Sequence, residues 1–355
     1  MKGIARFFTL YWIIYFPTCI AYNDLPGFSS IDEAMTILLF LYTITKFGSR
    51  YTNRKPWNEF FICISIIAFY VGYSLMFGAN VAGGVWLDLM QEIRPYTIIF
   101  CTWILNPQFT KKQKKWMLAT MIVTLFSWIL YHPESFENKN SEFPVLGQLA
   151  ICTGMAWCLL TEPTKRNRYI ALALVLTGML APKFKFMGEV ICFVAFVFFL
   201  KKRLNFRSPK TMIYCALILA VVLTVTWTRF DAYYVSGLSN DELARPMTYK
   251  TSLKILYDYF PFGSGMGSFA CNGAWKYYSP LYYKYKLNDI WGLDEGGGFI
   301  CDAYYPTLAQ FGVVGVFFFL WFWKRRMSAI NVIVDMRYYR VAMITICCLS
   351  IEQTS

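Results

Sequence analysis

The chain has 355 residues, of which 57% are hydrophobic, 19% aromatic and only 15% charged, with a formal net charge of +13. A soluble domain carries about 25% charged residues, and apolar runs recur along this whole chain, so the composition excludes a soluble domain with one anchor and predicts an integral membrane protein. We expect no nucleic-acid partner, because surplus Lys and Arg belong to the cytoplasmic loops of multi-pass proteins.

Apolar runs of roughly 15–22 residues recur in chain order and predict an all-α, multi-pass fold. The first run is too long and aromatic for a signal peptide and lacks a small-residue cleavage site, so we expect a retained helix. The seventh and eighth runs are short, and a re-entrant pair is the alternative there. The chain stops just after the eleventh run, which leaves room for a twelfth helix. The predicted spans are 4–22, 31–47, 58–78, 85–105, 115–132, 144–161, 168–181, 186–200, 211–228, 303–323 and 338–352.

Basic residues gather in every second connection between these runs. The remaining connections are short, neutral or acidic. Positive charge marks the cytoplasmic side of a membrane protein, so one orientation satisfies the whole pattern and places the N-terminus in the cytoplasm. The clusters are Lys46/Arg50/Arg54/Lys55, Lys111/Lys112/Lys114/Lys115, Lys165/Arg166/Arg168, Lys201/Lys202/Arg203/Arg207/Lys210 and Lys324/Arg325/Arg326 with Arg337 and Arg340.

One long outer connection follows the ninth span. It is polar, rich in tyrosine and interrupted by glycines, and its basic and acidic residues balance, which predicts a folded extracytoplasmic cap rather than a disordered segment. Within it, Pro246 to Tyr259 has the pattern of an amphipathic helix, with Leu253, Leu256, Tyr257 and Phe260 at helical spacing. The chain therefore divides into transmembrane helices 1–9 (1–228), the cap (229–300) and the C-terminal transmembrane helices (301–355).

Arg94 lies inside the fourth span, where a charged side chain costs at least about 2.5 kcal/mol and usually faces a cavity or a partner. Pro95 is expected to kink the helix and open the site towards the outer face. The alternative is that Arg94 extends to the interface or pairs with Glu92 or Asp88.

Lys183 and Lys185 occupy the short outer turn APKFKFMG, on the side where positive charge is otherwise scarce. They are candidates to hold a phosphate at the membrane surface, with Glu189 placed to pair with Lys185; the alternative is anchoring to lipid headgroups. In the cap, Arg245 precedes the amphipathic helix and is a fourth basic residue outside the cytoplasmic pattern.

The cap also contains FPFGSGMGSF, which lacks the Lys-Ser/Thr of a Walker loop. Its glycines permit tight turns and let another group come close to the backbone. One interpretation is that the backbone amides bind an anion. Asp302 follows where the chain re-enters the membrane, and its carboxylate is a candidate general base for a hydroxyl nucleophile; the alternative is an ordinary helix N-cap. Gly312 and Gly315 are expected to allow close helix packing.

The ladder of spans, the large late outer loop, FPFGSGMGSF and LAQFGVVGVFFF resemble the O-antigen polymerase and O-antigen ligase family of bacterial envelopes, most specifically over residues 240–323. The resemblance implies an inner-membrane enzyme that transfers an undecaprenyl-pyrophosphate-linked glycan to an acceptor hydroxyl on the periplasmic face, polymerising O-antigen, capsule or exopolysaccharide repeats. Ligases of this family typically have a histidine at the re-entry motif, where this chain has Asp302. That departure favours a polymerase-like or otherwise divergent member of the family.

The resemblance and the charge pattern together define a candidate site. Asp302 and Arg245 are the expected catalytic residues, and the chain contains no Asp-x-Asp motif, so we expect neither a metal nor a cofactor. The expected partners are the lipid-linked glycan, its glycan acceptor, membrane lipid and, as a further candidate, a chain-length regulator protein. A flippase and an assembly subunit are the competing functions. The expected pyrophosphate-binding residues are Arg94, Lys183, Lys185 and Arg245, and the expected sugar-stacking residues, alternatively an interfacial aromatic belt, are Tyr277, Tyr278, Tyr282 and Tyr283.

Overall fold

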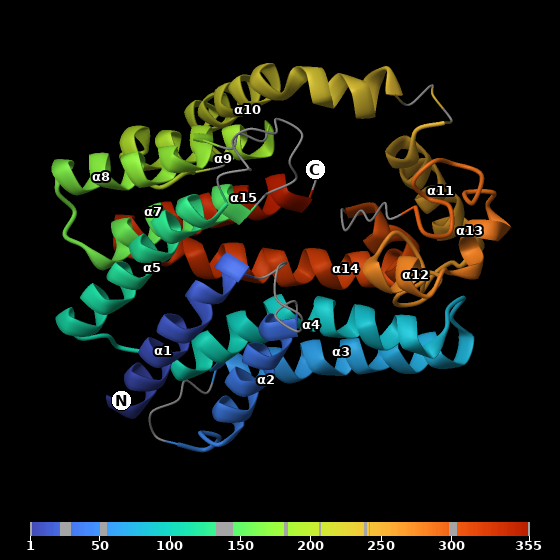
Figure 1. The fold of residues 1–355 in the computed structure, drawn as a ribbon, viewed down its shortest axis with the longest axis horizontal. Coiled ribbons are helices and arrows are strands. Elements are labelled where there is room, and N and C mark those ends of the chain that lie inside the picture. The colour runs from blue at the N-terminus through green and yellow to red at the C-terminus, as the bar shows by residue number, and fades with distance from the viewer. Residues whose placement is uncertain are drawn as a thin grey trace.

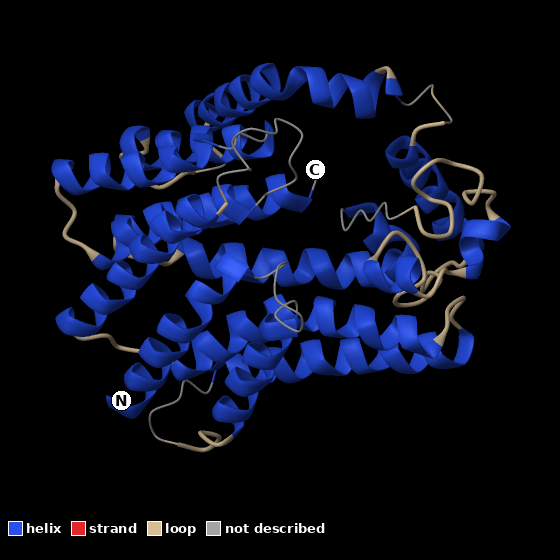
Figure 2. Cartoon of the chain, in the orientation of Figure 1, coloured by secondary structure: helices blue, strands red, loops and turns tan. Residues whose placement is uncertain are grey.

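The computed structural model describes residues 2–21, 30–49, 55–132, 145–180, 184–205, 207–237, 240, 242–297 and 304–353, and this part of the chain is helical with no strand (Figure 2). The all-α prediction is confirmed. The helices are α1 (Lys2–Tyr15), α2 (Ile31–Ile44), α3 (Lys55–Phe77), α4 (Ala82–Leu105), α5 (Lys111–Tyr131), α7 (Val145–Leu160), α8 (Lys165–Leu176), α9 (Phe184–Val194), α10 (Pro209–Phe230), α11 (Ala244–Asp258), α12 (Asn272–Lys276), α13 (Pro280–Lys284), α14 (Tyr304–Asn331) and α15 (Met336–Gln353).

Each of the eleven predicted runs contains a helix, and short 3₁₀ or π turns extend several of them. The seventh and eighth runs are short, as expected: α8 has 12 residues and α9 has 11. At 1.5 Å per residue each is under about 20 Å long, less than the roughly 30 Å hydrocarbon core of a bilayer. The extensions are η1 (Phe16–Ala21), η3 (Thr177–Leu180), η4 (Ala195–Phe199) and η5 (Asp231–Val235).

Local signals in the sequence set several helix ends. Thr110 accepts a hydrogen bond from the Gln113 amide at 3.3 Å, and the Gln113 side chain accepts from the Thr110 amide at 2.9 Å, which forms a capping box at the start of α5. Thr164 caps α8 in the same way through the Asn167 amide. α4 ends at Leu105 and is followed by Asn106, which adopts the left-handed conformation common after a helix.

The helices pack into two groups. The larger core joins α5, α7, α8, α9 and α15, and contains Trp128, Phe193 and Tyr339. A second core joins α3, α4 and α14 around Phe60, Phe100 and Phe322, and α1 and α2 pack beside it. Helices distant in sequence are therefore neighbours, with α14 lying alongside α3 and α4 (Figure 1).

Three described helical segments are long and apolar enough to cross a membrane: Lys2–Ile20, Pro56–Phe77 and Pro209–Thr228. The last of these is the most exposed, since only 6% of its apolar window is buried, and Met212, Ile213 and Leu217 all project outward. A helix that is apolar around most of its surface, yet buried so little by protein, is suited to lipid. For the other predicted runs, crossing the membrane stays a prediction.

The described connections that carry basic clusters, which are those between α4 and α5, α7 and α8, α9 and α10, and α14 and α15, lie at the end of the bundle opposite the cap (Figure 1). Hydrogen bonds join two of them directly. Arg203, after η4, donates to the carbonyl of Asn331 at 3.0 Å, and Arg340 on α15 donates to the carbonyl of Leu200 at 2.9 Å. The described connections that carry basic clusters therefore share one end of the folded bundle.

The predicted amphipathic helix of the cap is α11, but its apolar stripe does not face the core. Thr251, Ser252 and Ile255 are buried, whereas Tyr257 and Phe260 are 85% and 69% exposed. The short hydroxyl side chains allow α11 to approach α14 closely, since Ile255 and α14 share the core of the cap. The stripe is left on the surface, where it resembles the apolar face of a helix lying at a membrane interface.

Candidate functional site

The glycine-rich turn FPFGSGMGSF joins the cap to the bundle. Its Ser264 carbonyl accepts a hydrogen bond from the Ala79 amide at 2.9 Å, in the connection between α3 and α4. The Met266 amide donates to the hydroxyl of Ser74 at 2.7 Å, and the hydroxyl of Tyr73 donates to the Gly263 carbonyl at 2.8 Å. The turn is therefore inserted against the α3–α4 hairpin.

The backbone amides of this turn are already used by protein acceptors. The Gly267 amide donates to the carboxylate of Asp88 at 2.7 Å, and the Ser268 amide donates to the side chain of Gln310 at 3.1 Å. The amides of residues 263 to 266 likewise donate to carbonyl or hydroxyl oxygens of the protein. The interpretation of these amides as an anion cradle is wrong, because they already hold a buried carboxylate and other acceptors of the chain.

Close backbone contact explains why glycine stands at these positions. Gly267 has φ +72°, and a Cβ there would lie 2.4 Å from the carbonyl oxygen of Gly84. Gly312 has φ +59° and interrupts α14, and a Cβ there would lie 2.3 Å from the carbonyl oxygen of Pro261. The prediction that Gly312 allows helix packing is corrected: it breaks α14, so that the Val314 amide bonds to Pro261 at 3.3 Å.

Arg94 lies in the middle of α4 and forms ion pairs with α2. Its guanidinium is hydrogen-bonded to Asp32 and lies 3.5 Å from a carboxylate oxygen of Glu33. Asp88, a partner considered from sequence, instead accepts the amide of the glycine-rich turn. A pyrophosphate at Arg94 would therefore compete with two carboxylates. Ten residues separate Arg94 from the Gly84 junction with the cap, which is about 15 Å along the helix.

The other candidate charges lie on different elements. Arg245 is in the first turn of α11 and partly exposed, while Lys185 is in the first turn of α9, also partly exposed. Glu189, one turn further along α9, is 1% exposed. Lys183 and Asp302 lie outside the described residues. The placement of the candidate base and of one lysine in the candidate phosphate site thus stays a prediction.

The four candidate tyrosines divide into different roles. Tyr282 is 2% exposed and its hydroxyl accepts the Ala270 amide, so it belongs to the core of the cap and offers no ring face to a sugar. This corrects the prediction for Tyr282. Tyr278 stacks on it with ring centroids 5.3 Å apart. Tyr283 is 55% exposed, and Tyr277 lies over the start of α4, where Gly83 makes room for its ring.

Three of the cap tyrosines, Tyr278, Tyr283 and Tyr285, have a raised pKa. Burial, the neighbouring Tyr283 and the nearby carboxylates raise the pKa of Tyr278 above its usual value. Burial and the hydrogen bond to Asp258 do the same for Tyr285. These hydroxyls therefore remain protonated well above neutral pH and act as hydrogen-bond donors, as the Tyr278 hydroxyl does to the Leu293 carbonyl.

Trp291 is the residue of the cap that reading the sequence missed. It is 91% exposed and lies close in sequence to Asp289, Asp294 and Glu295. A tryptophan projecting from an acidic surface provides a broad ring face beside hydrogen-bond acceptors, which is an arrangement suited to a carbohydrate. A lone tryptophan within a polar stretch, NDIWGLDE, was the available signal.

Comparison with protein-family models, curated proteins and solved structures gives no match for this chain. Within the described ranges, no three His, Cys, Asp or Glu side chains are grouped so as to hold a metal ion.

Proposed function

We propose that the protein is a membrane glycosyltransferase that uses a polyprenyl-pyrophosphate-linked oligosaccharide and extends a glycan on the outer face of the bacterial inner membrane. The observation that carries the proposal is the cap, a folded unit attached to only one end of the helical bundle, opposite the basic connections (Figure 1). With the basic end in the cytoplasm, the cap and its exposed aromatic residues lie on the periplasmic side.

The exposed apolar stripe of α11 supports this location. Tyr257 and Phe260 project from the cap, and Met76 and Phe77 project from the adjoining end of α3. Such side chains are suited to the boundary between headgroups and acyl chains, where the lipid part of a polyprenyl-linked donor also lies. The cap would thus meet the sugar while the bundle contacts the lipid.

The reaction forms a bond between the acceptor hydroxyl oxygen and the anomeric carbon of the donor, and breaks the bond from that carbon to the pyrophosphate oxygen. The bonding electrons leave with the pyrophosphate, and the hydroxyl proton passes to the base, for which Asp302 is the candidate. Arg245 with Lys183 and Lys185 would stabilise the charge that develops on the leaving group. This assignment requires no metal ion.

A flippase for the same lipid-linked glycan is the second candidate, and the partly buried charges of Arg94, Asp32 and Glu33 favour it. Charged side chains within a helical bundle often mark a path for a polar substrate. Purified protein separates the two functions. Elongation of a synthetic polyprenyl-pyrophosphate oligosaccharide by the protein in detergent, where no second membrane face exists, supports the transferase. If the protein moves the lipid-linked glycan across vesicle membranes but elongates no glycan, the transferase is refuted.

The residue test uses Arg245→Ala with Lys254→Ala as a matched control on the exposed side of α11. We expect Arg245→Ala to abolish the ladder of surface-glycan chain lengths, with normal amounts of protein in the membrane, and Lys254→Ala to leave the ladder unchanged. A normal ladder in Arg245→Ala removes Arg245 from the site.

Arg94 needs a compensated variant, because Arg94→Ala also removes the ion-pair partner of Asp32 and Glu33. The triple variant Arg94→Ala, Asp32→Asn, Glu33→Gln removes the need for that partner. If Arg94 binds pyrophosphate, both variants lose the ladder. If the triple variant regains the ladder, Arg94 serves only to neutralise the carboxylates of Asp32 and Glu33 on α2.

A further inference from the structure

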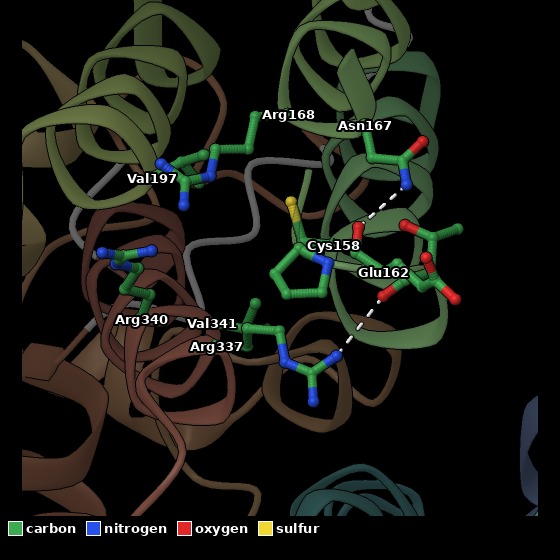
Figure 3. Close-up of a pocket in the computed structure, with 10 residues that line it drawn as sticks. Cys158, Glu162, Asn167, Arg168, Val197, Arg337, Arg340 and Val341 are labelled. Atoms are coloured by element: carbon green, nitrogen blue, oxygen red, sulfur yellow. Dashed lines mark hydrogen bonds between the residues drawn. The ribbon is translucent and has the colours of Figure 1, made fainter. Parts of the chain in front are cut away.

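A pocket lies at the end of the bundle opposite the cap, between the end of α7, the starts of α8 and α15, and η4 (Figure 3). Its lining includes Arg168 from α8 and Arg337 and Arg340 from α15. The gathering of basic residues in every second connection accounts for the positive charge at this end of the bundle. It does not account for the convergence of three arginines from two helices on one hollow.

The charges in this pocket are only partly neutralised. Arg337 binds Asp335 through two nitrogens, at 2.6 and 3.0 Å, and is therefore paired. Arg340 uses its Nε to bind the Leu200 carbonyl, and within the described ranges no acceptor contacts its two terminal nitrogens. In the same part of the chain the Arg168 side chain forms no hydrogen bond or ion pair. Figure 3 shows Arg168 and Arg340 close to each other beside Val197.

Two guanidinium groups that face one hollow repel each other unless an anion lies between them. Glu162 is the one acidic residue among those that line the pocket, and it is exposed. The N-termini of α8 and α15 are also at the pocket, and each contributes partial positive charge. The local field therefore favours a ligand with concentrated negative charge and several acceptor oxygens.

We propose that this pocket binds a phosphate group through Arg168 and Arg340, carried either by an anionic phospholipid or by a soluble phosphate. The site is separate from the proposed glycosyl-transfer site, since it lies at the other end of the bundle. Tyr169, next to Arg168, is 64% exposed, and its ring lies 5.4 Å from that of Phe198. These rings provide an apolar surface beside the charged hollow, of the kind that an acyl chain would cover.

The test measures binding to the purified full-length protein in detergent. Native mass spectrometry is carried out with phosphatidylglycerol, with phosphatidylcholine and, separately, with inorganic phosphate at matched ionic strength. The key variant is Arg168→Gln, which removes the charge and breaks no hydrogen bond described above. Arg166→Gln is the matched control, because Arg166 is exposed on the same helical turn and does not line the pocket.

We expect phosphatidylglycerol or phosphate to bind wild type and Arg166→Gln equally, and to bind Arg168→Gln about tenfold more weakly, the loss expected for one charge-assisted hydrogen-bonding partner. Arg168→Lys keeps the positive charge but loses the paired N–H donors of the guanidinium, and we expect intermediate binding. Preference for phosphatidylglycerol over phosphate and phosphatidylcholine identifies a lipid headgroup; binding of phosphate alone identifies a soluble ligand. Equal binding by Arg168→Gln and Arg166→Gln, or binding of neither probe, overturns the proposal.

Discussion

Replacing Gly267 by alanine tests whether the cap is held to the bundle by backbone contact. Two costs combine at this position. An L-residue at φ +72° costs about 1–2 kcal/mol, and a Cβ placed 2.4 Å from the Gly84 carbonyl oxygen forces the two backbones apart, which costs about 1–3 kcal/mol more. We therefore expect Gly267→Ala to lower the free energy of unfolding by roughly 2–5 kcal/mol and to expose the cap to protease.

Gly296 provides a control for the first cost alone, because it has φ +90° and nothing lies within 4 Å of the position its Cβ would take. Gly296→Ala should therefore show only the conformational penalty. The assay is denaturant unfolding in detergent, followed by limited proteolysis of cap and bundle fragments. If the two variants are equally stable and equally resistant to protease, the close approach at Gly267 does not hold the cap, and the reasoning is refuted.

Three further predictions concern other parts of the fold. Asp88→Ala leaves the buried amide of the glycine-rich turn without its acceptor and should cost about 1–3 kcal/mol in unfolding experiments, whereas Asp88→Asn, which keeps an oxygen, should cost less; equal losses would contradict this. Leu217→Asp, on the exposed face of α10, should make membrane insertion less favourable by about 2.5–3.5 kcal/mol in a glycosylation-mapping assay. Val334→Asp, in an exposed connection, should insert normally. If Leu217→Asp leaves insertion unchanged, α10 lies in water. Arg337 holds the pKa of Asp335 below its usual range through hydrogen bonds, so the stability from this pair is present near neutral pH and is lost as the pH falls below about 4. The difference in unfolding midpoint between wild type and Arg337→Gln should therefore disappear in acid, and a constant difference would show that the pair is not its source.

The helices of this protein could be predicted from sequence because long apolar runs have few alternatives, and their ends carry recognisable signals such as Thr110 with Gln113. What the runs could not indicate is which face of a helix meets another element. Leu253 and Tyr257 of α11, with Phe260 just after the helix, form the predicted apolar stripe, yet the buried face contains Thr251 and Ser252. Small hydroxyl side chains were favoured there because the partner helix comes close.

The candidate site was harder to predict than the helices, because its contacts join residues that are far apart in the chain. The partners of Arg94 are on α2, 62 and 61 positions earlier, and local sequence offered only Asp88 and Glu92. The glycines at 263–267 gave a correct indication of close approach, but the approaching group is the protein's own backbone and a carboxylate. Tyr282 was indistinguishable by spacing from its exposed neighbour Tyr283.

The bond between Asp88 and the Gly267 amide spans 179 positions of the chain. At about 5–20 residues per second, a ribosome needs roughly 10–40 s to make that length of polypeptide. During this interval the α3–α4 hairpin has already been synthesised. The Met266 and Gly267 amides, which bind Ser74 and Asp88 in the complete fold, have not. A chain arrested before residue 267 would therefore lack the amide that Asp88 binds in the complete fold.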